Sequence, residues 1–370
     1  MDQARFNPRQ LARFLGDRVS RLWRSPPSPT RCAQPPAREP KRPLYVTCEG
    51  ATLRLDGERL VVTQAGETLA AAPLDEVGEV VLVGSAHITT PALHALLRAG
   101  VSVAWHSTSG WFLGHTASFD PPGLDRRIAQ LRTAAEPARA LAVARQLVST
   151  KLEGQRLLLR RAGVGRLELC RLERLAFAAG RAEDIDELRG LEGAGAAFYF
   201  AAIPKLVRGR GTPFADTFPG RRQRPATDPL NAALSFAYAL LCRVTTVALA
   251  KHGLDVRLGF LHAPRAGKPA LALDLMEPWR PLLADRAVFS AINRGELSTT
   301  GFTSNGDSLL MDRAAKRALV AAFERRLDGT IHHPALDSPV PWRAVPSLQA
   351  QLLGDWLTGA RADLPQPRPR

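Results

Sequence analysis

The sequence predicts an α+β protein in which a small N-terminal β-rich domain precedes a larger all-α domain. Three observations support this fold class. Residues 43–120 contain segments of alternating β-branched and polar side chains, residues 121–335 carry apolar side chains at helical spacing, and prolines at 121 and 122 separate the two patterns. With 370 residues, 45% of them hydrophobic, the chain is long enough to bury two cores.

The β-rich domain is expected to span residues 43–120. The segment LYVTCEGATLRLDGERLVVTQ favours a hairpin that turns at Asp56 and Gly57, and the segments DEVGEVVLVG and AGVSVAWHS continue the sheet. Between them, Thr90 as N-cap and Pro91 as first helical residue predict a short helix that ends at Gly100. The preceding residues 1–42 hold ten Lys or Arg and a proline-rich stretch, so we expect a poorly ordered basic arm there.

Helices are expected throughout residues 121–335. Asp228 and Pro229 are an N-cap and a first-turn proline that begin a long apolar helix, which ends at Gly253. Because this helix is apolar on almost every face, we expect it at the centre of the all-α domain. Arg243 interrupts its apolar run, so the sequence predicts no membrane span. Residues 336–370 are expected to form a C-terminal tail.

The charge balance predicts a polyanionic partner. The formal net charge is +15, and nucleic acid is the leading class of partner for so basic a chain. The alternative is a generally basic proteome, since arginine greatly outnumbers lysine here. The four cysteines match no zinc or iron–sulfur spacing and no dense disulfide framework, so we expect reduced thiols and a cytoplasmic protein.

Two acids and a histidine occur close together in GFLHAPRAGKPALALDLMEPWRP, residues 259–281. Asp274 and Glu277 are three residues apart and would share one face of a helix. The alternative is that they cap a helix start, with Asp274 as N-cap and Glu277 at the third helical position. His262 precedes a turn that can bring its imidazole beside these acids, and such a nitrogen and oxygen set suits Mg²⁺ or Mn²⁺. For His262 an ordinary core histidine is the alternative.

Glu192 is a third candidate ligand because it begins the run of Gly and Ala in EGAGAAFYF. Gly193 and Gly195 each weaken a helix by about 1 kcal/mol relative to Ala, a cost that is expected where another backbone approaches closely. The alternative is that Glu192 is a first-turn acid favoured by the helix dipole.

Basic residues lie in the loop that follows this helix and in the turn after His262. A solvated surface is the usual explanation of such a run, but its position beside the candidate ligands favours binding of DNA phosphates. The predicted DNA-binding residues are Lys205, Arg208, Arg210, Arg221, Arg222, Arg224, Arg265 and Lys268.

Taken together, these segments resemble the CRISPR-associated Cas1 family of integrases and endonucleases. The matching stretches are LYVTCEGATLRLDGERLVV, EGAGAAFYF, RRQRPATDPLNAALSFAYALL and GFLHAPRAGKPALALDLMEPWRPLLADRAVFSAINR, in that order. The resemblance implies a dimerising β domain and an α-helical catalytic domain with metal ligands Glu192, His262 and Glu277. It implies that Asp274 is an auxiliary acid on the same face, and it leaves open whether Asp274 or Glu277 binds directly. Gly154 departs from the asparagine that relatives often have beside Gln155.

The resemblance also implies a function in spacer acquisition. In such a reaction the 3′-OH of a short DNA attacks a phosphodiester at the CRISPR repeat boundary with Mg²⁺ or Mn²⁺ as cofactor, and water in place of the 3′-OH gives nuclease activity. The implied partners are double-stranded DNA, a second copy of the chain, a bridging dimer of the small Cas2 protein and a separate iron–sulfur Cas nuclease. Two alternatives are a metal-dependent nuclease of branched DNA in repair and a non-catalytic DNA-binding scaffold.

Overall fold

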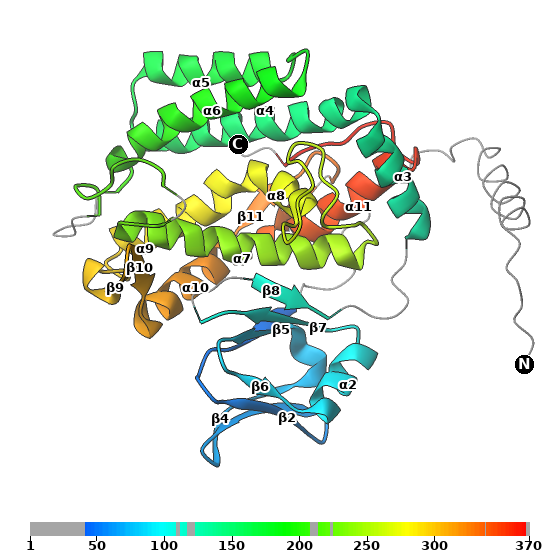
Figure 1. The fold of residues 1–370 in the computed structure, drawn as a ribbon, viewed down its shortest axis with the longest axis vertical. Helices are drawn as coiled ribbons and strands as arrows, with labels where there is room; N and C mark the ends of the chain where they lie inside the picture. Colours follow the sequence, from blue (N-terminus) through cyan, green and yellow to red (C-terminus); the bar gives the residue numbers. More distant parts are fainter. Residues whose placement is uncertain are drawn as a thin grey trace, which may run out of the picture.

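The computed structural model describes residues 41–108, 112–116, 123–207, 214–222, 225–336 and 338–367. All but the last two residues of the expected basic arm lie outside this part of the chain. Figure 1 shows the β-rich domain at the bottom and the helical domain above it, with α7 between the sheets and the helices α4, α5 and α6. The predicted α+β class is therefore confirmed: the last strand of the first domain, β8, ends at His115, and the first helix of the second, α3, begins at Leu124.

The β-rich domain consists of two four-stranded sheets and one helix. The first sheet has the order β1 (Arg42–Val46), β5 (Val77–Val83), β7 (Ser102–His106), β8 (Phe112–His115). The second has the order β4 (Glu67–Pro73), β3 (Arg59–Gln64), β2 (Thr52–Asp56), β6 (His87–Ile88). Strands β1, β5 and β7 are parallel, whereas β2 and β3 form the predicted hairpin, with Asp56 opposite Arg59 and Gly57 at a φ of 59°. A 3₁₀ turn, η1 (Leu74–Glu76), links β4 to β5.

The α-helix among the described residues of this domain, α2 (Thr90–Arg98), begins one residue earlier than predicted. Thr89 is the N-cap, and its hydroxyl accepts a hydrogen bond from the Ala92 N–H. The predicted cap Thr90 is instead the first helical residue, followed by Pro91. Leu96 of this helix packs with buried strand residues such as Leu53 and Val80, which close the core of the β-rich domain.

The second domain is mostly helical and contains two small hairpins, so the expectation of an all-α domain is too strict. Its helices are α3 (Leu124–Ala135), α4 (Pro137–Arg161), α5 (Arg166–Ala179), α6 (Ile185–Ala202), α7 (Pro229–Lys251), α8 (Ala270–Met276), α9 (Arg286–Asn293), α10 (Arg313–Asp328) and α11 (Val345–Leu357). Short 3₁₀ turns are η2 (Ile203–Lys205), η3 (Glu277–Trp279), η5 (Thr299–Gly301) and η6 (Trp342–Ala344), and η4 (Arg280–Asp285) is a short π-helical segment. The hairpins pair β9 (Phe302–Asn305) with β10 (Ser308–Met311) and β11 (Thr330–His332) with β12 (Pro339–Pro341).

Helix α7 is the central helix of this domain, as predicted. Asp228 caps it by accepting the Asn231 N–H, Pro229 is its first residue, and Gly253 follows its end at a φ of 75°. By length and composition alone α7 is the one described helix that could cross a membrane, but 72% of its apolar stretch is buried inside the protein. Its apolar surface therefore serves as domain core.

The C-terminal residues 336–370 differ from the predicted tail. They form β12, η6 and helix α11, whose Leu348, Leu352 and Leu353 are buried in the helical core. In Figure 1, α11 lies beside α3, and an ion pair of 2.7 Å joins Arg126 of α3 to Asp355 of α11. The helical domain is therefore closed by residues beyond its expected boundary at 335.

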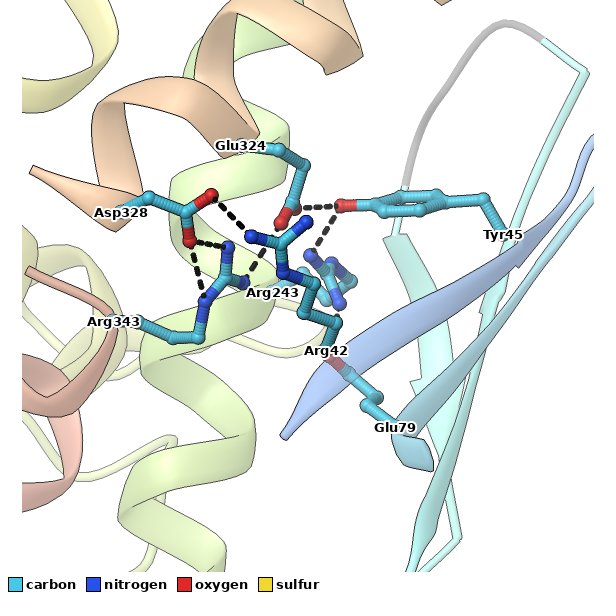
Figure 2. A network of polar contacts seen from close by, with 7 residues as sticks. All are labelled: Arg42, Tyr45, Glu79, Arg243, Glu324, Asp328 and Arg343. Carbon is cyan, nitrogen blue, oxygen red and sulfur yellow. Dashed lines mark hydrogen bonds and ion pairs between the residues drawn. The ribbon is translucent and has the colours of Figure 1, made fainter. Parts of the chain in front are cut away.

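A polar network that includes the buried Arg243 joins the two domains. Arg243 of α7 pairs with Glu79 of β5 and donates from Nη2 to the Tyr45 hydroxyl of β1 at 2.9 Å. Tyr45 in turn donates to Glu324 of α10 at 2.7 Å. Figure 2 shows the seven members of the network, which are Arg42, Tyr45, Glu79, Arg243, Glu324, Asp328 and Arg343. Arg243 is fully buried, and its ion pair with Glu79 compensates this charge across the domain boundary.

Candidate metal-dependent active site

One cavity of about 750 Å³ in the helical domain brings together side chains that are far apart in the sequence. Glu192 of α6, His262 of the turn before α8 and Glu277 of η3 all line it. Lys151 of α4 and Arg280 of η4 line it as well. The three predicted ligands therefore line the same cavity.

Glu192 lies in the middle of its helix. The N-cap of α6 is Asp184, whose carboxylate accepts the N–H groups of Asp186 and Glu187. The interpretation of Glu192 as a first-turn acid is therefore wrong. Gly195 is buried where α6 meets α4, and a Cβ there would lie 2.1 Å from Cδ2 of Leu152, so this glycine does mark a close approach.

Asp274 positions the turn that carries His262. It lies inside α8, so its interpretation as an N-cap is also wrong, and its carboxylate is fully buried. Oδ2 accepts the N–H groups of Phe260 and Leu261 at 2.5 and 2.9 Å, and Oδ1 accepts the His262 N–H at 2.9 Å. Oδ1 also lies 2.6 Å from Nδ1 of His262. Both oxygens of Asp274 are thus engaged by the turn.

The imidazole of His262 is fixed by this contact. Its Nδ1 is held by Asp274, which leaves Nε2 as the ring nitrogen available to a ligand, the usual arrangement of metal-binding histidines. Burial opposes protonation of His262, but its hydrogen bond with Asp274 and the charges of Asp274 and Glu277 outweigh it and raise the pKa of His262 above its ordinary value.

The two glutamates are bridged by a lysine. Nζ of Lys151 lies 2.5 Å from Oε1 of Glu192 and 2.7 Å from Oε2 of Glu277. Because both oxygens touch one nitrogen, they are at most about 5.2 Å apart, the two distances combined. Arg280 contacts the other oxygen of Glu277 at 3.1 Å. Burial would raise the pKa of Glu277, but the charges of Arg280, Lys151 and His262 hold it below its ordinary value.

The donor set suits a divalent cation, although it is not assembled around one. Two carboxylates and an imidazole braced by a third carboxylate are ligands that Mg²⁺ and Mn²⁺ accept. Oε2 of Glu277 is buried and lies 2.7 Å from the ammonium of Lys151. Across the described ranges, however, no three His, Cys, Asp or Glu side chains are placed to hold an ion as they stand. The ammonium of Lys151 lies between the two glutamates instead.

Five of the eight predicted DNA-binding residues lie in the described part of the chain. Arg221 lines the cavity, donates to Asn231 and Ser235 and lies over the ring of Tyr238, so it is part of the folded site. Lys205 is exposed and pairs with Glu168 at 3.1 Å. Arg222, Arg265 and Lys268 are exposed, whereas Arg208, Arg210 and Arg224 lie outside the described residues.

Three features of the site were not predicted. Arg280 follows Glu277 by three residues, a spacing that could have indicated the ion pair. Lys151 is 41 residues from Glu192, and no local pattern connects them. Asp285 accepts hydrogen bonds from Tyr199 and Tyr238 at 2.7 and 2.6 Å, and burial raises its pKa to about 6.

Comparison with known proteins agrees with this architecture. A family model described as CRISPR associated protein Cas1 matches residues 44–325. The chain is 42% identical over 338 residues to a CRISPR-associated exonuclease Cas4/endonuclease Cas1 fusion of Rhodospirillum rubrum, an alignment that covers 90% of this chain and 58% of that protein. It is 35% identical to an endonuclease named Cas1 2 from the same organism, covering 85% of this chain and 95% of that protein.

Solved structures share the fold. A casposase bound to integration product superposes with a TM-score of 0.76 at 22% identity, covering 87% of this chain and 92% of the casposase. A Cas1 protein from Thermotoga maritima superposes with a TM-score of 0.73 at 20% identity, covering 86% of this chain and 97% of the Thermotoga maritima chain. At these identities the similarity is evidence for the fold alone. The chain spans 58% of the length of two fusion relatives, from Rhodospirillum rubrum and Geobacter sulfurreducens.

Proposed function

The chain belongs to the CRISPR-associated Cas1 family, and from this premise we propose that it is an integrase and endonuclease of CRISPR adaptation. In the proposed reaction, the 3′-OH of a short DNA fragment attacks a phosphodiester at the repeat boundary and joins the strands. The observation that carries the proposal is the meeting of Glu192, His262 and Glu277 in one cavity, with His262 braced by Asp274.

We propose Glu192, His262 and Glu277 as the residues that hold Mg²⁺ or Mn²⁺. Glu277 is the better candidate for a direct ligand than Asp274, because both Asp274 oxygens already bind the turn before α8. When bound, such an ion supplies charge neutralisation at the phosphoryl oxygens. Asp274 orients the imidazole and keeps its other ring nitrogen facing away from the carboxylate.

The remaining chemistry of phosphoryl transfer is positioning and electrostatics, which this chain supplies with cationic side chains. Arg280 is held beside Glu277, and Arg221 projects from the segment before α7 into the same cavity. Arg265 and Lys268 are exposed in the turn that follows His262, where they can bind backbone phosphates on either side of the reacting group.

The proposed partners follow from the same premise. The structural neighbours include a Cas6-RT-Cas1–Cas2 complex, which supports Cas2 as a partner. We propose that a Cas2 dimer bridges two dimers of this chain. The fusion relatives support a Cas4 nuclease as a further partner. We propose dimerisation through the β-rich domain, and double-stranded DNA as substrate.

A strand-joining assay tests the proposal. Duplexes with free 3′-OH ends are incubated with a plasmid carrying the repeat, with Mn²⁺ or with EDTA. We expect joined product only with Mn²⁺, and a loss of at least about 100-fold in Glu192→Gln and His262→Ala. Glu153→Gln is the matched control, since Glu153 is an exposed carboxylate on α4.

The outcomes separate the alternatives. Joined product supports an integrase, whereas metal-dependent cutting of branched DNA without joining would favour a repair nuclease. If DNA binding persists but no reaction depends on metal or on Glu192, the chain is a non-catalytic scaffold and the proposal is wrong.

A further inference from the structure

Lys151 occupies an unusual place for a lysine. It projects from α4 with a side chain only 8% exposed, and its ammonium contacts one carboxylate from α6 and one from η3. These are the two glutamates that the proposed function assigns to a divalent cation. A single positive charge thus already lies between both oxygens that the ion would need.

Removing these charges from water is costly unless they compensate one another. The side chain of Glu277 is 1% exposed, and its cationic neighbours are Lys151, Arg280 and His262. Without Lys151, these oxygens of Glu192 and Glu277, at most about 5.2 Å apart, would face each other, with Arg280 as the cation still in contact with Glu277. Two like charges that close repel strongly in a poorly solvated cavity.

We propose that Lys151 is a positioning residue that holds Glu192 and Glu277 together in the metal-free protein and competes with the divalent cation for the same two oxygens. The inference rests on the proposed function, because it takes these glutamates as ligands. Binding of the ion then requires the ammonium to leave the space between them. The flexible four-carbon stem of lysine permits this, and Lys151 borders the open cavity into which it can turn.

The lysine is a charged competitor at neutral pH. Burial alone would lower the pKa of Lys151, but the charges of Glu277 and Glu192 outweigh it and raise that pKa. An arginine at this position would keep the charge with a bulkier, planar head group, whereas methionine and glutamine remove the charge at similar length. These differences separate the effect of charge from that of size.

Titration calorimetry with Mn²⁺ in the absence of DNA tests the inference, together with melting temperature in EDTA. For Lys151→Met we expect about tenfold tighter Mn²⁺ binding and a lower melting temperature in EDTA that Mn²⁺ restores. Lys151→Gln, which can still donate a hydrogen bond, should shift the Mn²⁺ affinity in the same direction. It keeps the test possible if the methionine variant fails to fold. Lys151→Arg should bind Mn²⁺ no more tightly than the wild type.

Lys251→Met is the matched control, because Lys251 is exposed at the end of α7. Unchanged or weaker Mn²⁺ binding in both Lys151→Met and Lys151→Gln would overturn the inference while leaving the metal site intact. Absence of Mn²⁺ binding by the wild-type chain would overturn the proposed metal site as well. The two failures are therefore distinguishable without any activity measurement.

Discussion

Replacing Arg243 by methionine should destabilise the protein through the domain boundary. Arg243 is fully buried in α7, and its guanidinium pairs with Glu79 and donates to Tyr45 (Figure 2). Methionine preserves much of the side-chain volume but leaves Glu79, whose side chain is 13% exposed, without its cation. Breaking a buried pair on one side costs about 3–5 kcal/mol, so we expect a loss of that size in the free energy of unfolding.

Chemical denaturation at pH 7 measures this loss. Arg54→Met is the control, since Arg54 forms an exposed pair with Asp56 that should contribute under about 1 kcal/mol. The double variant Arg243→Met/Glu79→Gln should be more stable than the sum of the single changes predicts, because it removes both charges at once.

The pH dependence gives a second test of the same reasoning. Burial already raises the pKa of Glu79 above 4.5 although Arg243 opposes it, and removal of Arg243 should raise it further. In Arg243→Met the folded state then favours the protonated acid, so the contribution of Glu79 to stability is fully present below pH 4.5 and is lost as the pH rises through the folded pKa of Glu79. A loss below about 1 kcal/mol at pH 7, or strict additivity in the double variant, would refute this account.

Three further predictions concern single positions. Gly154→Ala should stabilise α4 by about 0.5–1 kcal/mol, because the new Cβ meets only ordinary contacts at 3.6 Å. Gly195→Ala should destabilise the protein, because its Cβ would overlap Leu152. The melting temperatures of the two variants, compared with that of the wild type, test both expectations. Burial lowers the pKa of His252 to about 4, so the wild type should lose about 3 kcal/mol of stability as the pH falls from 6.5 through 4. Chemical denaturation across that pH range should show a smaller loss of stability for His252→Gln. Asp274→Ala should lower both Mn²⁺ affinity and strand joining by about 10- to 100-fold, and equal activity to the wild type would show that the His262 brace is dispensable.

The sequence by itself determined the elements whose signals are local. Asp228 and Pro229 begin α7 as predicted because an N-cap needs only the N–H groups of the next turn. The β2–β3 hairpin follows from alternation and a two-residue turn within one short segment. The family and its candidate ligands could also be recognised from the sequence, because the motifs around Glu192 and around His262 and Glu277 occur in the same order along the chain as in the family.

Only the tertiary structure decided what each of these groups does. Asp274 and Glu277 fit a capping pattern in sequence, yet Asp274 binds the turn of His262, and Glu277 meets a lysine from another helix. The residues predicted as a C-terminal tail form the core helix α11, because α3 and α7, which lie far from it in the sequence, supply the surface that buries it. Backbone hydrogen bonding acts over about four residues and leaves a readable pattern, whereas the partner of a buried charge is set by how distant helices pack.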